Sequence, residues 1–209
     1  MRWRPCGTTA ALLELDDLGT VLGLHARIEA ERDAGRLPQL LEVVPAARTL
    51  LLRCATSDEL AIAAGQVDGL EPLATGERDA SVEPVRLPVR YDGPDLDDVA
   101  ALLGIDAAEV RARHLHARWT VAFTGFAPGF GYLVADGDSG LEVPRLPEPR
   151  TNVPAGAVGL AGEFSGVYPR SSPGGWRLIG TCTTPTWDEG RDPPALLRPG
   201  TPVVFEEAP

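Results

Sequence analysis

The chain has 209 residues, of which 44% are hydrophobic and 23% charged, and its formal net charge is −11 at pH 7. This composition is typical of a globular protein with one large or two small domains. The acidic balance argues against non-specific binding to nucleic acid or to an anionic membrane, and no apolar run is long enough to cross a bilayer.

The first third of the chain alternates between strand and helix patterns. Apolar spacing and capping residues predict five elements in the order β-α-β-β-α, over residues 3–15, 16–35, 40–44, 49–54 and 57–67. This order is typical of a split βαβ, ferredoxin-like domain, so we expect a closing strand near residues 83–89. Residues 70–81 show no periodicity, and we place the domain junction there, which predicts domains over 1–81 and 82–209.

The second domain is predicted to be mainly β-structure. A strand over 87–91 is followed by two short helices, over 94–104 and from 106 to about 114, and by a strand over 119–123. Short apolar runs then recur between turn signals, at residues 158–161, 176–180 and 201–206. Such spacing is typical of a β-barrel or a β-sandwich.

The cysteines and the residues that follow Met1 indicate the cellular compartment that we expect for the protein. Cys6, Cys54 and Cys182 are odd in number and far apart, so they suggest neither a disulfide framework nor a paired metal-ligand motif. The charged residues after Met1 are not followed by the apolar core of a signal peptide. We therefore expect reduced, mostly buried thiols in a cytoplasmic protein.

A block rich in glycine, proline and aromatic residues carries the strongest functional signal. Its three phrases cover Phe123–Leu133, Pro149–Gly159 and Tyr168–Gly180. Glycine permits left-handed backbone and close approach, whereas proline fixes φ, so dense use of both predicts loops of fixed shape. Such loops on a β-scaffold are typical of a binding or catalytic rim.

The first phrase invites a nucleotide-binding interpretation, which its residues do not support. It lacks the Gly-Lys-Ser/Thr end of a P-loop, and Val134 stands where a dinucleotide fingerprint needs glycine or alanine. We instead predict a rim loop that presents Phe126, Phe130 and Tyr132. The alternative is that these aromatic rings simply fill the mouth of the barrel.

Two side chains are candidates for chemistry on an anionic group. Arg150 is bracketed by Pro149 and Pro154, which favours a guanidinium pre-ordered for a carboxylate or phosphoryl oxygen over a surface arginine that caps carbonyls. His114 ends a predicted helix, where it is either an acid-base group or a cation that complements the helix dipole. No third or fourth ligand accompanies His114 and His116, so we expect no metal site.

The order of these phrases resembles the KipI and allophanate hydrolase subunit 1 family. The matching phrases include Gly125–Phe130, Pro149–Thr151, Val153–Gly159 and Ser172–Trp176. The resemblance covers nearly the whole chain and is strongest over Leu87–Phe205. It implies an α+β protein, with a ferredoxin-like domain over residues 1–81 and a cyclophilin-like β-barrel domain over 82–209.

The family includes subunits of ATP-dependent 5-oxoprolinases, and the resemblance implies that this chain is such a subunit. It would act on a small cyclic amide, 5-oxoproline, together with a sister carboxyltransferase-type subunit and a third subunit. ATP would be used by the complex, and we expect no cofactor bound by this chain itself. Two alternatives remain open, namely a KipI-type inhibitor that binds a sporulation histidine kinase and a subunit of urea or allophanate metabolism.

The resemblance and the residue chemistry together define the predicted site. We predict Arg150 and His114 as catalytic residues. We predict as substrate-binding residues those that shape or line the three phrases: Phe126, Pro128, Gly129, Tyr132, Pro154, Gly156, Tyr168, Pro173 and Gly174.

Overall fold

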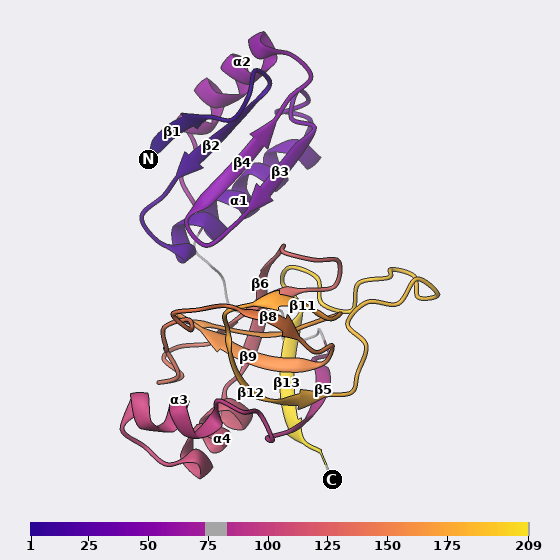
Figure 1. The fold of residues 1–209 in the computed structure, drawn as a ribbon. Helices are drawn as coiled ribbons and strands as arrows, with labels where there is room; N and C mark the ends of the chain where they lie inside the picture. Colours follow the sequence, from indigo (N-terminus) through magenta and orange to yellow (C-terminus); the bar gives the residue numbers. More distant parts are fainter. Residues whose placement is uncertain (74–82, 209) are drawn as a thin grey trace. The chain divides into compact units, whose positions relative to one another are not determined.

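The computed structural model describes residues 1–73 and 83–208 (Figure 1). The chain divides into two compact units, residues 1–79 and residues 80–209. The predicted junction at residue 81 lies outside the described residues. Among the described residues, no helix combines the length and the apolar character that a bilayer crossing requires.

The first unit is a four-stranded antiparallel sheet with two helices. Its elements are β1 (Arg2–Pro5), β2 (Ala10–Glu14), α1 (Leu18–Asp33), β3 (Glu42–Pro45), β4 (Thr49–Arg53) and α2 (Ser57–Asp68). The strand order is β1-β2-β4-β3. Leu13, Leu50 and Leu52 alternate along β2 and β4 onto one face of the sheet, where they form a single core with Leu24 and Ile28 of α1 and with buried residues of α2.

Local capping signals explain where these helices begin. The carboxylate of Asp17 accepts a hydrogen bond from the backbone N–H of Thr20 at 2.7 Å. Thr56 and Glu59 form a reciprocal capping box at the start of α2. Both devices satisfy N–H groups that a helix leaves unpaired at its first turn, so the predicted helices are confirmed close to their expected starts.

The predicted closing strand of this unit is wrong. A strand does form there, β5 (Val85–Arg90), but it pairs with two strands of the second unit, where Leu87 and Val89 are fully buried. The edge of the first sheet next to β2 is occupied instead by β1. The single strand predicted over residues 3–15 is in fact the β1–β2 hairpin, which turns at Gly7 with a φ of 79°.

The second unit contains a closed barrel of seven strands in the order β10-β7-β6-β13-β5-β12-β9. These strands are β6 (Trp119–Thr124), β7 (Gly131–Ala135), β9 (Ala157–Ala161), β10 (Phe164–Val167), β12 (Arg177–Cys182), β13 (Pro202–Glu207) and the β5 strand already described. Strands β8 (Arg150–Val153) and β11 (Ser172–Gly174) form a separate two-stranded sheet, here called the arm.

Helices α3 (Leu96–Leu103) and α4 (Ala107–His116) lie together against β12 and β13 (Figure 1). Both predicted helices are therefore confirmed, as are the apolar runs that became β9, β12 and β13. Buried aliphatic and aromatic residues of the barrel and the two helices form one core cluster. The long connection between β12 and β13 extends away from the barrel in Figure 1 and supplies one wall of the site described next.

Candidate functional site

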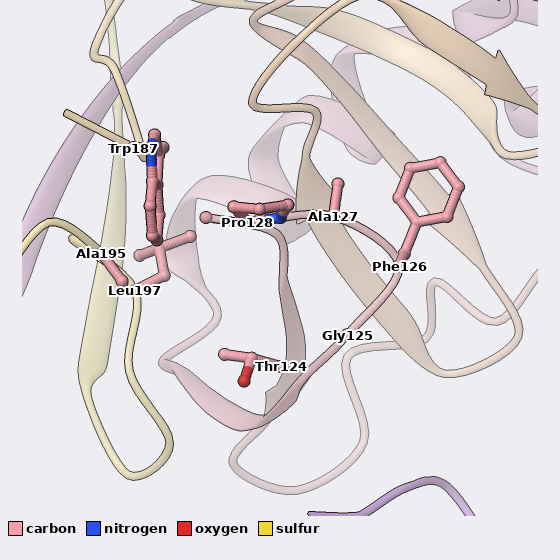
Figure 2. Close-up of a pocket in the computed structure, with 9 residues that line it drawn as sticks. Thr124, Gly125, Phe126, Ala127, Pro128, Trp187, Ala195 and Leu197 are labelled. Carbon is pink, nitrogen blue, oxygen red and sulfur yellow. The ribbon is translucent and has the colours of Figure 1, made fainter. Parts of the chain in front are cut away.

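A pocket of about 420 Å³ lies between the loop that joins β6 to β7 and the long connection before β13. We call it the rim pocket (Figure 2). Its volume is in the range of small-molecule sites. It is lined by Thr124, Gly125, Phe126, Ala127, Pro128, Gly129, Trp187, Ala195 and Leu197. Most of these groups are apolar, so the pocket suits a compact organic ring better than a highly charged ligand.

Close backbone packing fixes the wall between the two segments. Gly129 has a φ of 83°, and a Cβ atom at this position would come within 2.7 Å of the Trp187 Cβ atom. Trp187 is positioned in turn by a β-bridge to Ala195. Figure 2 shows the indole of Trp187 facing the Pro128 ring, with Leu197 and Thr124 below them. Glycine is therefore required at position 129 both for its φ and for this approach.

Phe126 is the one non-glycine residue with positive φ in the described part of the chain, at 65°. The residue is 57% exposed, and Figure 2 shows its ring pointing away from Trp187. A bulky residue in the left-handed region carries strain, and such strain is concentrated at functional sites. The ring contacts Phe130 and Tyr168, so it joins the rim pocket to the aromatic cluster behind it.

The aromatic cluster consists of rings in mutual contact at centroid distances of 4.4 to 6.5 Å. Its members are Phe123, Phe126, Phe130, Tyr132, Phe164, Tyr168 and Trp176. Phe130, Tyr168 and Trp176 are buried and belong to a core separate from that of the barrel interior. Each interpretation of the rim loop therefore holds for a different residue. Phe130 fills a core, as the alternative interpretation expected, whereas Phe126 is presented to solvent, as expected of a rim residue.

The arm carries a second group of predicted residues. Gly174 pairs with Arg150 across the arm, and a Cβ atom at Gly174 would lie 2.4 Å from the Tyr168 hydroxyl oxygen. Pro154 and Pro173 are exposed. Gly156 has a φ of 81°, and a Cβ atom there would come within 2.2 Å of the Cys182 carbonyl oxygen. The backbone conformation and this close approach are enough to require glycine at position 156, whether or not the residue contacts a substrate.

Burial sets the ionisation of the two tyrosines in the cluster. It raises the pKa of Tyr132 and of Tyr168, so both phenols stay protonated and able to donate a hydrogen bond at neutral pH. The positive charge of Arg145 acts on both tyrosines and opposes this rise. Arg145 was not predicted from the sequence, where its only signal is a basic residue in a proline-rich stretch.

Arg150 is held by a carboxylate from a distant part of the chain. Its Nη2 donates to Asp95 Oδ1 at 2.6 Å, and its Nη1 lies 3.5 Å from the Trp176 carbonyl oxygen. The arginine side chain is 28% exposed, whereas that of Asp95 is 5% exposed. The guanidinium is thus held through both terminal nitrogens, while part of the side chain remains exposed.

His114 lies inside the barrel unit, away from both groups. It is fully buried, its Nδ1 is 2.7 Å from the Tyr91 hydroxyl, and its Nε2 is 2.8 Å from the Ser165 hydroxyl. Its ring packs on Phe205 at 4.2 Å. Burial lowers the pKa of His114 to about 3. The geometry favours a structural role, and the ring is neutral at pH 7 rather than the helix-dipole cation considered from the sequence.

The structure therefore separates the predicted residues into three places. The rim pocket is lined by Phe126, Pro128 and Gly129. The arm and the residues beside it include Arg150, Pro154, Gly156, Pro173 and Gly174. The third place is the buried core of the barrel unit, which contains His114. Tyr132 and Tyr168 belong to the aromatic cluster. Tyr168 contacts both Phe126 at the rim pocket and Gly174 in the arm, so the first two places adjoin the same ring. Within residues 1–73 and 83–208, no three histidine, cysteine, aspartate or glutamate side chains are grouped as metal ligands.

Comparison with known proteins gives consistent matches. The family model of the carboxyltransferase domain, subdomain C and D, matches residues 1–197. The chain is 36% identical to the 5-oxoprolinase B subunit of Escherichia coli O157:H7, over 95% of this chain and 92% of that protein. It is 42% identical to the 5-oxoprolinase B subunit of Bacillus subtilis strain 168, over 58% of this chain and 51% of that protein.

Solved structures agree with these matches. The conserved protein PH0987 from Pyrococcus horikoshii is 30% identical with a TM-score of 0.55, covering 99% of this chain and 97% of its own. The protein TTHA0988 is 37% identical with a TM-score of 0.73, but this chain covers only 40% of it. The urea amidolyase of Kluyveromyces lactis, at 18% identity and a TM-score of 0.76, shares the fold over 14% of its length. The resemblance found in the sequence is thereby confirmed, and the chain belongs to the carboxyltransferase domain, subdomain C and D, family.

Proposed function

We propose that this chain is the B subunit of an ATP-dependent 5-oxoprolinase, which hydrolyses 5-oxoproline to glutamate together with a sister carboxyltransferase-type subunit and a third subunit. The observation that carries the proposal is the 36% identity to the E. coli B subunit, because it extends over nearly the full length of both chains. The rim pocket supports it, since an open apolar pocket of this size suits a five-membered lactam ring.

The chemistry explains why ATP is needed. Resonance makes a lactam carbonyl a poor electrophile. Transfer of the γ-phosphoryl group to the carbonyl oxygen releases ADP and activates the carbon toward water. Addition of water and cleavage of the ring C–N bond then leave an acyl phosphate, which a second water hydrolyses to glutamate and phosphate. Because the sequence of this chain contains no P-loop, we assign the nucleotide to another subunit.

In this proposal the chain's own residues bind and orient the substrate. The lactam ring packs between Trp187 and Pro128 in the rim pocket, and Arg150 holds negative charge on the substrate. His114 keeps the barrel in register rather than transferring a proton, because both its nitrogens are engaged in a sealed interior. Trp187 and Phe126 are 37% and 57% exposed, so a neighbouring subunit would complete the site.

The finer structural expectations belong to the same proposal. We infer that residues 1–81 and 82–209 are separate domains, the second of cyclophilin-like type. The first would be a ferredoxin-like variant in which β1 replaces the closing strand, because β2, α1, β3, β4 and α2 follow the expected order. A cytoplasmic location is consistent with three free cysteines.

Reconstitution tests the proposed function. The chain is purified together with its sister and third subunits, and ADP release is measured with and without 5-oxoproline. We expect hydrolysis of ATP that depends on 5-oxoproline and is lost when this chain is omitted. Full activity of the remaining subunits without this chain would overturn the proposal. So would a complete complex whose rate of ADP release is the same with and without 5-oxoproline.

A further inference from the structure

A buried carboxylate outside the predicted site is held in an unusual way at the start of α3. Asp95 is the N-cap residue of this helix, where an aspartate ordinarily accepts a hydrogen bond from its own first turn. Its side chain makes no such bond. It points instead to β12 and β8, and it is only 3% exposed. The carboxylate therefore does not cap α3, and it binds segments that are distant in the sequence instead.

Those contacts anchor Asp95 from two sides. Asp95 Oδ2 accepts from the Leu178 N–H at 2.6 Å, and the Asp95 N–H donates to the Leu178 carbonyl at 2.9 Å. Gly93 makes this approach possible, because a Cβ atom there would lie 2.3 Å from the Leu178 carbonyl oxygen. The other oxygen, Oδ1, is left for Arg150. The position of the carboxylate is therefore fixed by the backbone of the barrel.

The consequence for Arg150 is a guanidinium of fixed orientation. A buried carboxylate needs a charge partner, so Nη2 of Arg150 stays against Oδ1 of Asp95. A long, flexible side chain loses rotamer freedom when it binds an anion, and a tether formed beforehand removes most of that cost. These bonds to Asp95 and to the Trp176 carbonyl use two of the five guanidinium N–H donors. Because the side chain is 28% exposed, the remaining donors are left for a second, external carboxylate.

We propose that Asp95 is a positioning residue, which holds Arg150 ready to bind the carboxylate of 5-oxoproline. The inference rests on the proposed function. Asp95 does not itself contact the substrate, because its two oxygens are already engaged by Arg150 and Leu178. It acts through the orientation of Arg150, so its removal is expected to weaken substrate binding more than it slows turnover.

The test uses the reconstituted complex with Asp95→Asn, which keeps the shape of the side chain and removes its charge. We expect KM for 5-oxoproline to rise by about tenfold with a much smaller change in kcat, the size expected for one charge-assisted hydrogen bond. Asp95→Glu retains the charge one methylene further out and should give an intermediate KM. Val99→Ala, a cavity variant of the same helix, should lower stability without changing KM.

A double-variant cycle separates positioning from mere stabilisation. In an Arg150→Met background, Asp95→Asn should add no further increase in KM, because the group that it positions is gone. Equal effects of Asp95→Asn in both backgrounds, or an unchanged KM in the folded variant, would overturn the inference. A wild-type complex without 5-oxoproline-dependent ATP hydrolysis would instead contradict the proposed function, so the two failures are distinguishable.

Discussion

Replacing Arg150 with methionine is expected to lower the free energy of unfolding of residues 80–209 by about 2–3 kcal/mol. The reason is the carboxylate that remains, because Asp95 is 3% exposed and would keep one bond, from Leu178, and lose its charge partner. We place the effect below the range for fully buried pairs because the guanidinium is itself partly exposed. Urea unfolding of the single variant, followed by tryptophan fluorescence, measures it.

The double variant Asp95→Asn/Arg150→Met is expected to regain most of this stability, since the carboxamide is uncharged and still accepts from the Leu178 N–H. The same double variant should not regain activity in the complex. A double variant no more stable than Arg150→Met alone would contradict the idea that an unpaired Asp95 causes the loss.

Acid is expected to destabilise the barrel unit well above the pH at which carboxylates titrate. Burial lowers the pKa of His114 from 6.5 to about 3, so the unfolded chain binds a proton that the folded unit rejects. Stability is therefore complete above pH 6.5 and falls as the pH drops below it, by about 1.4 kcal/mol per pH unit. Between pH 6.5 and pH 4.5 we expect a loss of about 2 kcal/mol, because the slope reaches its full value only below the unfolded pKa.

His114→Gln provides the matched comparison for this pH dependence. The variant will be less stable at pH 7, because glutamine does not reproduce both bonds to Tyr91 and Ser165, but its stability should change little over the same range. Trp119 packs against the His114 ring and reports on this unit. His25, whose pKa burial also lowers, acts in the same direction in the first unit, so the units must be followed separately. If the stability of the barrel unit fell equally steeply with decreasing pH in the wild type and in His114→Gln, the pH dependence would not come from His114.

The sequence predicted the helices and the long strands because each has a local cause. Apolar spacing and capping residues lie within one element, as Thr56 and Glu59 do at α2. The first hairpin was misassigned because Gly7 is a weak turn signal inside an alternating run. The pairing of β5 depended on strands more than 80 residues away, so no pattern within residues 83–89 distinguished the two sheets.

The same distinction applies to the candidate site. The loop residues of the rim pocket were predictable, because Phe126, Pro128 and Gly129 form one glycine- and proline-rich phrase. The wall formed by Trp187 was not, since a single tryptophan in a long connection gives no local signal. Asp95 was hidden for a different reason, because an aspartate before a helix is ordinarily explained by capping.

The most direct measurement of the central claim, that the rim pocket binds the substrate, is KM for 5-oxoproline of the complex assembled with Trp187→Ala. Removal of the indole should raise KM by about tenfold or more, because the apolar wall facing the lactam ring is lost. Leu102→Ala removes another exposed apolar side chain, on α3 and outside the pocket, and should leave KM unchanged. The same KM in wild type and Trp187→Ala would contradict the claim.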